Sequence, residues 1–505
     1  MNAVNRKTEW NRGMAVGSVI CFLVNLVVLL LLLTGLLVVE KYGQFTATFK
    51  DNSANYAYIA FCVILLIWIT YFYFFFENRK LLADAKRVTM VFVLVEMCVA
   101  LSWAFGRYVN IYARPVALAG LLALTLVGRR DAIFLNVVCA FLIFILDNFA
   151  STAQTPVDVY SSLVIAFSAG MIAIFLGNKI KTRLQVVWIG IIIVIPMEII
   201  IFLLEICSLA AAGATEAAIA TETVFRSILT NMGFGLLGGL LSAVFFLAIL
   251  PVFESLFNCL TAFRLRELTD TDAKLLRKLK EGAPGTYNHS AVVAQLAEAC
   301  AESIGEDADL ARAAAFYHDV GKLHQPEYFT ENQDEYNLHD ELTPELSADI
   351  IRSHTQDGFD LIRNHHLPQF FADVAREHHG TLPIRYFYAK ALKMTDGELN
   401  IEDFSYTGPK PRSKIAAIIM IADASEAVSR ALTKRSPEEV EKAVSGIIEE
   451  RMDLEQFSDC DITMKDLTVI RETLVNTLSG VYHHRVKYPT IKYTRKGGKT
   501  MGEGE

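Results

Sequence analysis

The chain has 505 residues, of which 53% are hydrophobic and 20% are charged. This charged fraction is below the roughly 25% of an average soluble domain, so the composition excludes a wholly soluble chain. A formal net charge of −8 excludes a broadly basic nucleic-acid-binding protein, and eight cysteines without CxxC spacing indicate neither a disulfide framework nor a thiolate zinc site.

Residues 1–250 are rich in Leu, Ile, Val and Phe, whereas the chain from about residue 264 onward is rich in charge. A membrane-crossing helix needs roughly 20 mostly apolar residues to cross a hydrocarbon layer about 30 Å thick. About eight such helices are predicted, at 14–39, 57–76, 88–106, 113–128, 132–148, 158–177, 184–207 and 228–250. The fourth segment is short and joins the fifth tightly, so whether these two are separate full crossings stays open.

The first apolar run, from Met14 to Val39, is predicted to be a retained helix rather than a cleaved signal peptide. It is longer than the apolar core of a signal peptide, which has about 7–15 residues, and it lacks a clear small-residue cleavage site. We therefore count it with the other membrane helices.

Basic residues indicate the orientation, because the cytoplasmic loops of membrane proteins carry an excess of Lys and Arg. If the N-terminus is cytoplasmic, twelve basic residues lie inside: Arg6, Lys7, Arg12, Arg79, Lys80, Lys86, Arg87, Arg129, Arg130, Lys179, Lys181 and Arg183. Five lie outside: Lys41, Lys50, Arg107, Arg114 and Arg226. With an even number of spans, we expect a multi-pass protein of the plasma membrane whose N-terminus and soluble half are both cytoplasmic.

Residues 251–284 are predicted to form a juxtamembrane linker helix, because a charged stretch follows the last apolar segment. Helical patterns continue through residues 285–484, and strand-like alternation is nearly absent, so we expect an all-α soluble domain. The fold class is therefore all-α, with a polytopic helical membrane domain followed by this helical domain. The glycine-rich tail, 485–505, is predicted to be flexible.

Five polar residues in the soluble half continue the apolar stripe of a predicted helix. They are His289, His318, His354, His378 and Asp423. At helical spacing, each of these side chains points into the core with its apolar neighbours. Burying five polar groups is costly unless something satisfies them together. A shared metal site does so, because neutral imidazoles and carboxylates are common metal ligands.

Glycines near three of these histidines predict helix ends. Gly321 follows His318, Gly358 follows His354, and Gly380 follows the pair that begins at residue 378. Glycine is the usual residue just past a helix C-terminus. We therefore expect three helices to end at the site, each directing the negative end of its dipole toward the cation.

Five further histidines are interpreted as lying outside the metal site. They are His339, His365, His366, His483 and His484. His339 forms part of a second His-Asp dipeptide in a polar loop, from which it could contact a substrate.

The order of these residues resembles that of the HD superfamily of phosphohydrolases in its binuclear form. The local sequence is similar to that of the seven-transmembrane-HD family of cyclic di-AMP phosphodiesterases, the PgpH type, over roughly residues 57–490. The similar stretches are GTYNHS (285–290), YHDVGKL (317–323), ENQ (331–333), NLHD (337–340), SHTQDG (353–358), EHHGT (377–381), GPKP (408–411) and ADASEA (422–427).

The resemblance implies two divalent metal ions, Mn or Fe. One ion would be held by His289, His318, Asp319 and Asp423, and the other by His354, His378 and His379, with Asp319 bridging. Five imidazoles with two carboxylates suit these metals better than magnesium, which prefers oxygen ligands. Asp319 and Lys322 are the implied catalytic residues, with Lys322 close enough to assist at the phosphate.

The implied activity is hydrolysis of cyclic di-AMP to the linear dinucleotide pApA by a metal-bridging hydroxide, which lowers the level of this second messenger. The chain reads GTLPIRYFY after His379 and lacks the GYP motif, which argues against the related enzymes that cleave cyclic di-GMP. Relatives commonly carry a large extracellular domain after the first span. Here residues 40–56 are only a short loop, so a sensory role through such a domain is not expected.

Other functions stay open. The HD site could act on another nucleotide, such as cyclic di-GMP or guanosine tetraphosphate. The chain could also be a nucleotide-binding membrane receptor with an inactive HD domain, or a transporter, although no broken-helix pair or repeat supports transport. The expected partners are the cyclic dinucleotide and the lipid bilayer, without DNA or RNA, and a homodimer is one alternative for the oligomeric state.

Overall fold

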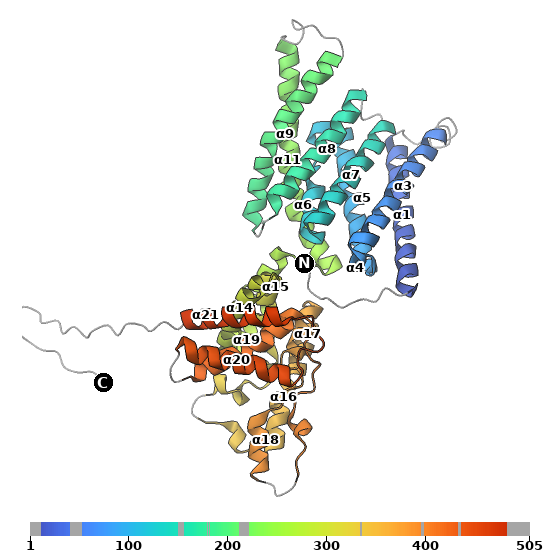
Figure 1. Ribbon diagram of the computed structural model, residues 1–505. Coiled ribbons are helices and arrows are strands. Elements are labelled where there is room, and N and C mark those ends of the chain that lie inside the picture. Colours follow the sequence, from blue (N-terminus) through green and yellow to red (C-terminus); the bar gives the residue numbers. More distant parts are fainter. Residues whose placement is uncertain are drawn as a thin grey trace, which may run out of the picture. The chain divides into compact units, whose positions relative to one another are not determined.

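The computed structural model describes residues 12–40, 53–149, 156–178, 180, 182–211, 222–333, 336–394, 398–432 and 436–481. These ranges are helical (Figure 1), without a β-strand, and an isolated bridge joins Pro383 and Ser405. The prediction of an all-α fold is confirmed. The chain divides into two compact units, Met1–Ala273 and Lys274–Glu505. The predicted flexible tail, His483 and His484 lie outside the described residues.

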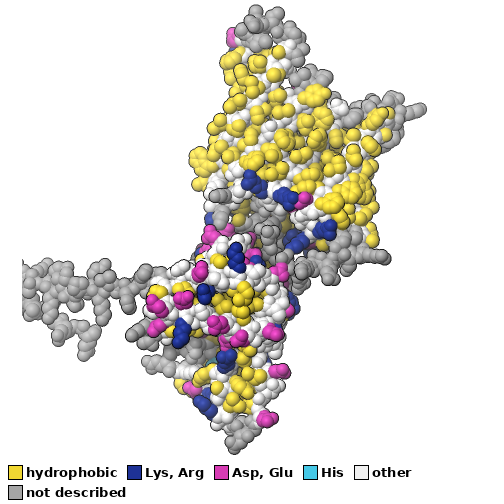
Figure 2. Space-filling view, viewed as in Figure 1, with side chains coloured by type: hydrophobic (Ala, Val, Ile, Leu, Met, Phe, Trp, Pro, Cys, Tyr) yellow, Lys and Arg dark blue, Asp and Glu magenta, His cyan; other side chains and the backbone are white. Residues whose placement is uncertain are grey.

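Within the described residues of the first unit, seven helices are long and apolar enough to cross a membrane. They are α1 (Arg12–Glu40), α3 (Ser53–Glu77), α5 (Ala85–Tyr108), α7 (Arg129–Phe149), α8 (Pro156–Gly177), α9 (Arg183–Ala211) and α11 (Glu222–Phe257). Hydrophobic side chains, yellow in Figure 2, cover the visible face of this unit. Such apolar outer faces on helices suit lipid, because a helix satisfies its own backbone hydrogen bonds.

The fourth predicted span, 113–128, contains a shorter helix than the other seven predicted spans. It contains α6 (Ala117–Val127), a helix of 11 residues. At 1.5 Å per residue α6 is about 16 Å long, roughly half the thickness of the hydrocarbon layer. It packs against α7 and α8, and every residue from Ala117 to Ala123 is buried. The question left open for this segment is answered for its helix, which is too short for a full crossing and is enclosed by the bundle.

The chain nevertheless returns across the bundle between α5 and α7. At one end, Tyr73 of α3 and the following Asn78 donate hydrogen bonds to Asp131 of α7, at 3.1 and 2.8 Å. At the other end, Arg114 donates from Nη2 to Oδ1 of Asp147 near the end of α7, at 2.8 Å. Helix α5 starts shortly after α3 ends, so it begins at the end of the bundle marked by Asp131 and runs to the end marked by Asp147. Because α7 starts again at the Asp131 end, the segment that contains α6 must run back across the bundle. This segment therefore counts as one passage.

The structure divides the predicted linker helix 251–284 into several helices. The end of α11 is followed by α12 (Ala262–Leu268) and α13 (Lys274–Gly282). Asn258 has a left-handed φ of 53°, which ends α11. The Thr261 side chain then accepts a hydrogen bond from the backbone of Arg264 and caps α12. The left-handed residue and the helix cap divide residues 251–284, which the charge pattern alone predicted to form one helix.

The soluble unit consists of further helices and short 3₁₀ turns. The α-helices after α13 are α14 (Pro284–Ser303), α15 (Ala308–Tyr317), α16 (Pro344–Asn364), α17 (Gln369–Glu377), α18 (Arg385–Leu392), α19 (Lys414–Ala431), α20 (Pro437–Asp453) and α21 (Met464–Val481). The 3₁₀ turns are η2 (Val320–His324), η3 (Pro326–Tyr328), η4 (Thr330–Asn332), η5 (Leu338–Asp340) and η6 (Ile401–Phe404).

Helix α19 lies at the centre of this unit. Every residue from Ile415 to Ala422 is buried, as expected for a helix that is apolar on all sides. Ser413 caps its start by accepting a hydrogen bond from the backbone of Ala416, at 3.1 Å. Helices α14, α20 and α21 pack against it. Because Asp423 directly follows the buried run, this carboxylate is presented from a firmly packed helix.

Candidate metal centre

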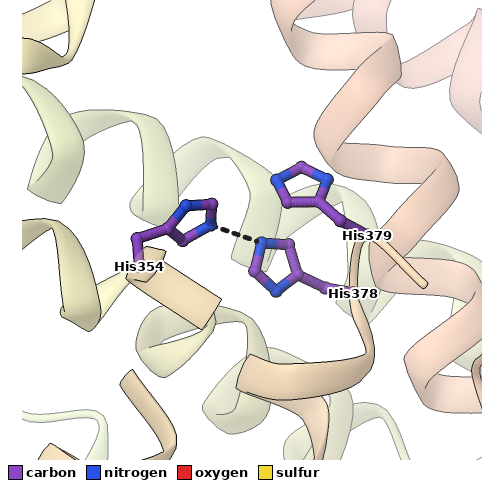
Figure 3. Close-up of side chains that lie close together, drawn as sticks. All are labelled: His354, His378 and His379. Atoms are coloured by element: carbon purple, nitrogen blue, oxygen red, sulfur yellow. Dashed lines mark hydrogen bonds between the residues drawn. The ribbon is translucent and has the colours of Figure 1, made fainter. Parts of the chain in front are cut away.

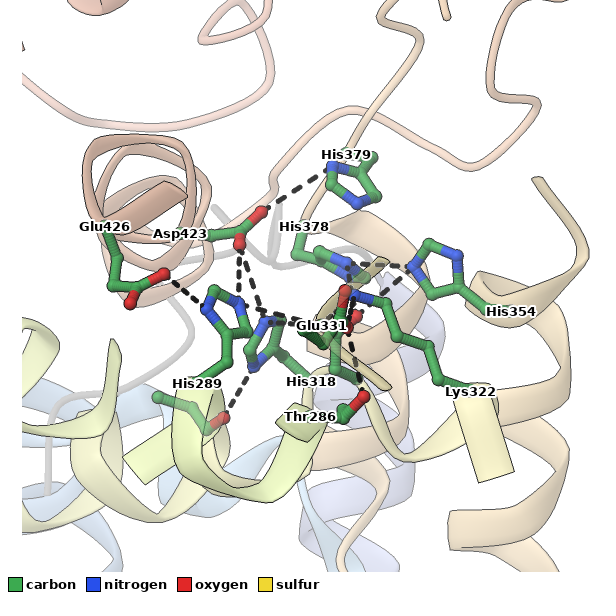
Figure 4. A network of polar contacts seen from close by, with 12 residues as sticks. Thr286, His289, His318, Lys322, Glu331, His354, His378, His379, Asp423 and Glu426 are labelled. Atoms are coloured by element: carbon green, nitrogen blue, oxygen red, sulfur yellow. Dashed lines mark hydrogen bonds and ion pairs between the residues drawn. The ribbon is translucent and has the colours of Figure 1, made fainter. Parts of the chain in front are cut away.

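The seven predicted ligands meet in the soluble unit, although they come from five helices or helix ends. Figure 4 labels all of them except Asp319. His289 lies in α14, His354 in α16 and Asp423 in α19, while His318-Asp319 and His378-His379 follow the last residues of α15 and α17. Three of these histidines, His318, His354 and His378, are almost fully buried. Segments up to 134 residues apart in the sequence are thereby brought into direct contact.

Among the residues that the structure describes, ligand atoms within 4.8 Å of one another form three groups that could hold a metal ion. The groups are His354, His378 and His379 (Figure 3); His289, His318 and Asp423; and His318, Asp319 and His378. The two carboxylate oxygens of Asp319 face different groups. Oδ1 lies 3.4 Å from Nε2 of His354, and Oδ2 lies 3.4 Å from Nε2 of His318. This geometry suits a carboxylate shared by two cations.

Two of the three predicted helix ends lie at the site. His318 and His378 directly follow α15 and α17 as their C-caps, so both helices direct their negative ends toward a cation. The third is wrong, because α16 continues ten residues beyond His354. Gly358 lies within α16, where a side chain would lie 3.3 Å from the backbone nitrogen of Gly321. This glycine therefore permits a close approach of η2 rather than ending the helix.

The hydrogen bonds of three histidines define their tautomers. Nδ1 of His318, His354 and His378 lies 2.6, 2.5 and 2.8 Å from a carbonyl oxygen of the preceding helical turn. A carbonyl can only accept, so in the neutral form that binds a metal each ring carries its proton on Nδ1 and directs the lone pair of Nε2 into the site. Two such atoms, Nε2 of His354 and Nε2 of His378, face each other at 3.3 Å (Figure 3).

These atoms fit a bound cation. Nε2 of His318 and Oδ1 of Asp319 are buried without a hydrogen-bond partner. Unsatisfied buried acceptors are costly, and two facing lone pairs repel unless a positive charge lies between them. A divalent ion satisfies all of these atoms together, and imidazole nitrogen with carboxylate oxygen is a donor set that transition metals prefer.

The site imposes opposite pKa shifts on its histidines. Burial lowers the pKa of His354 to about 3. Burial also acts to lower the pKa of His289, but hydrogen bonds with Asp423 and Glu426 outweigh it and raise the pKa to about 9. For His318, the neighbouring charge of Asp319 outweighs burial and raises the pKa to about 10. His289 and His318 are thus protonated at neutral pH when no metal competes for them. His354 is neutral at that pH and can bind a metal without losing a proton.

Acidification is expected to weaken metal binding by His289 and His318. A cation binds only the neutral imidazole, so it must displace the protons that pKa values of about 9 and 10 retain at neutral pH. Raising the pH from about 6 to about 9 should therefore increase the apparent Mn²⁺ affinity, with release of about two protons per chain at neutral pH. Calorimetry of the full chain in detergent, in buffers of different ionisation enthalpy, measures this release. A pH-independent affinity would contradict the assignment.

Lys322 lies beside the carboxylate that both groups share. Its Nζ lies 2.7 Å from Oδ2 of Asp319 and 2.9 Å from Oε1 of Glu331. Thr286 donates a hydrogen bond to the same oxygen of Glu331, at 3.0 Å. Burial acts to lower the pKa of Lys322, but Asp319 and Glu331 outweigh it and raise the pKa. The side chain therefore stays cationic and is held in a defined position.

Sequence reasoning did not single out three residues of this site. Glu331 holds Lys322, and Glu426 contacts His289 at 2.7 Å. The ring of Tyr406 stacks on His379, with centroids 4.4 Å apart. A signal existed for Glu426, because it follows Asp423 by three residues and so lies on the same face of α19. No spacing argument connects Tyr406 with His379.

Three of the other described histidines, His339, His365 and His366, lie apart from the metal-capable groups. His339 is buried, and its Nε2 lies 2.9 Å from the carbonyl oxygen of Tyr328. His365 contacts Lys278 at 3.3 Å and the carbonyl oxygen of Leu361 at 2.9 Å. His366 has a left-handed φ of 54° in the connection after α16. Within the described ranges, none of the three histidines belongs to a group that could hold a metal.

Both units match known families. Residues 53–261 match the family described as a 7TM receptor with intracellular HD hydrolase, and residues 286–428 match the HD domain. With its seven long apolar helices, the chain is therefore a multi-pass membrane protein that carries an HD domain. The HD domain and the three His/Asp groups together imply divalent-metal binding.

Two curated relatives bear the name cyclic-di-AMP phosphodiesterase PgpH. The protein of Bacillus subtilis (strain 168) is 37% identical over 417 residues, covering 82% of this chain and 56% of the relative. The protein of Listeria monocytogenes serotype 1/2a (strain 10403S) is 45% identical over 267 residues, covering 53% of this chain and 37% of the relative. This chain thus spans about half or less of the length of each.

Two crystal structures of the L. monocytogenes phosphodiesterase PgpH HD domain are also similar, one of them in complex with cyclic-di-AMP. They are 47% and 48% identical to this chain, with TM-scores of 0.40 and 0.41. Each match covers 42% of this chain and 99% of the HD-domain chain.

Proposed function

This chain belongs to the seven-transmembrane-HD family, and we propose that it is a membrane-bound phosphodiesterase that hydrolyses cyclic di-AMP to the linear dinucleotide pApA. The observation that carries the proposal is the meeting of five imidazoles and two carboxylates in ligand groups that Asp319 connects. Two relatives that bear the name of this activity support the choice of substrate. The reaction would lower the level of the second messenger.

The proposed cofactors are two divalent ions, Mn or Fe. His289, His318 and Asp423 would hold one ion, and His354, His378 and His379 the other, with Asp319 bridging. Held by these residues, two divalent ions would supply positive charge to a phosphodiester and would make water acidic enough to supply a nucleophile near neutral pH. Imidazole-rich coordination favours Mn or Fe over Mg, which prefers oxygen ligands.

The residues around the metal centre have separable proposed roles. Asp319 orients both halves of the site, because each of its oxygens faces a different ligand group. Lys322 supplies a permanent positive charge beside this carboxylate, where it can stabilise the charge that develops on the phosphate oxygens. Glu331 and Thr286 hold Lys322 in place and limit its freedom to move away.

A panel of nucleotides tests the substrate. The full chain, purified in detergent and loaded with Mn²⁺, is expected to convert cyclic di-AMP to pApA, as followed by chromatography. Cyclic di-GMP and guanosine tetraphosphate should be turned over at least about tenfold more slowly, a difference of roughly 1.4 kcal/mol in the activation barrier. The same preparation treated with a chelator should be inactive and should recover when Mn²⁺ is restored.

The alternative functions give different outcomes in this panel. Turnover of another nucleotide but not of cyclic di-AMP would overturn the substrate while leaving the HD site intact. Binding of metal and of cyclic di-AMP without any turnover would support a receptor with an inactive HD domain. Neither outcome depends on the orientation in the membrane.

We also propose that the N-terminus and the HD domain both lie in the cytoplasm. Residues 53–261 contain α3, α5, α6, α7, α8, α9 and α11, so the seven helices of the family description include the short α6. With α1 before them, the number of passages is even, as the excess of basic residues on one side also requires. A cysteine introduced into the 40–56 loop should react with a membrane-impermeant reagent on intact cells, and protection there would contradict this orientation.

A further inference from the structure

The second ring nitrogen of His289 has a partner unlike those of the other buried ligands. In His318, His354 and His378, Nδ1 donates to a neutral carbonyl of the same helix. In His289, Nδ1 lies 2.7 Å from Oε2 of Glu426, a carboxylate on α19. Figure 4 shows Glu426 and Asp423 at opposite nitrogens of this ring. Among these four imidazoles, only His289 thus has a charged partner behind it.

Glu426 is a buried carboxylate with a partner at each of its two oxygens. Its side chain is 1% exposed, a burial that a carboxylate tolerates only when it is paired. One oxygen accepts a hydrogen bond from Nε of Arg430 at 3.1 Å, and the other faces His289. Arg430 is half exposed one turn further along α19, so the pair compensates the charge without competing for the oxygen at His289.

A carboxylate behind a metal-binding imidazole has two physical effects. It fixes the tautomer and the plane of the ring, and it makes the opposite nitrogen a stronger donor. A neutral carbonyl does the same more weakly, because it carries no net charge. Only the ligand group of His289, His318 and Asp423 benefits from the carboxylate. The group of His354, His378 and His379 has no acidic member.

We propose that Glu426 is a positioning residue that makes the two metal sites unequal, by strengthening the one formed by His289, His318 and Asp423. The inference rests on the proposed two-metal centre but not on the identity of the substrate. Glu426 belongs to none of the three groups of described residues that could hold an ion. It acts through His289, whose ring it orients from the side away from Asp423.

The test compares E426Q with the wild type as full chains in detergent. Glutamine keeps the shape and a hydrogen-bond acceptor but removes the charge. Equilibrium dialysis with Mn²⁺ should find two ions per wild-type chain, whereas in E426Q one ion should bind about 10–100-fold more weakly and the other unchanged. Electron paramagnetic resonance at limiting Mn²⁺ should then show more uncoupled single ions in E426Q.

Hydrolysis separates positioning from a structural role. E426Q should regain activity at high Mn²⁺ concentration with an unchanged KM for the substrate, because excess metal fills the weakened site. A merely structural defect would not respond to metal. E426D keeps the charge on a shorter side chain and should lie between E426Q and the wild type. It also keeps the test valid if E426Q fails to fold.

Two control variants test whether the weaker binding of one Mn²⁺ ion is specific to Glu426 or follows from the loss of any charged side chain. E441Q removes an exposed carboxylate of α20 and should bind both ions as the wild type does. R430Q removes the partner of Glu426 but keeps the carboxylate at His289, so it should also retain both ions. Equal binding by E426Q and the wild type, equal weakening of both sites, or the same loss in R430Q would overturn the inference. A wild type that binds no metal would instead overturn the proposed function.

Discussion

Replacing Asp319 with alanine is expected to abolish hydrolysis of cyclic di-AMP and to prevent retention of metal. The carboxylate is 1% exposed, and its two oxygens face the two ligand groups. Its removal takes a ligand from both metal positions and leaves the ammonium of Lys322 with Glu331 alone. We expect the rate to fall by at least about 10³-fold, or roughly 4 kcal/mol in the activation barrier. Metal content per chain and turnover of the purified protein measure the two effects.

The second His-Asp dipeptide of the chain supplies the matched control. Asp340 follows His339 as Asp319 follows His318, but its side chain is 65% exposed and lies 3.7 Å from Lys390. D340A should therefore keep both the metal content and the rate of the wild type. Full activity in D319A would refute the role of the shared carboxylate, and an equal loss in D340A would show that the effect is not specific to the site.

Replacing Gly321 with alanine is expected to disrupt the site without touching a ligand. A side chain at this position would lie 1.9 Å from the carbonyl oxygen of His354 and 2.5 Å from the backbone nitrogen of Gly358. Both are backbone atoms, so η2 and α16 must move apart. Overpacking of this kind costs about 3 kcal/mol in the free energy of unfolding. Separation of Asp319 from His354 should also remove metal binding, as dialysis and thermal unfolding with and without Mn²⁺ would reveal.

Gly446 is the control for this substitution. It lies exposed within α20, and an added side chain would meet nothing within 4 Å. Alanine there should raise the free energy of unfolding by about 0.5–1 kcal/mol, because it is the better helix former. If G321A kept wild-type stability and metal content, the close approach of η2 and α16 would be refuted.

Five of the seven candidate ligands could be predicted from the sequence because each departs from a strong local pattern, whereas Asp319 and His379 were implied by the family resemblance alone. A histidine or aspartate on an apolar helical stripe, such as His289 or Asp423, must be satisfied in the interior by something. Glu426 was missed because glutamate on a helix is ordinarily a solvated residue. Its partner His289 is 137 positions away in the sequence. Only the packing of α14 against α19 brings the two together.

The role of glycine could not be foreseen in the same way. Gly380 has a left-handed φ of 53° and follows α17, as a C-terminal glycine should. Gly358 has the same sequence context but lies within α16, where it admits η2. A glycine that ends a helix and a glycine that permits close packing can stand in the same sequence pattern. Which of the two roles a glycine has depends on the segment packed against it, and that segment is distant in the sequence.

The apolar content of each half and the helical spacing of its apolar residues determined that this chain combines a helical membrane domain with an all-α soluble domain. Both features are local, because they depend on which side chains are buried and on whether lipid or water surrounds that half. They also predicted the types of candidate ligand, because buried imidazoles and carboxylates require a common partner. Only the tertiary structure decided that the fourth apolar segment is a short enclosed helix, since its length depends on what surrounds it. It also decided which oxygen of Asp319 faces which ligand group, and that a buried glutamate lies behind His289. These contacts join residues that are far apart in the sequence, so no local pattern records them.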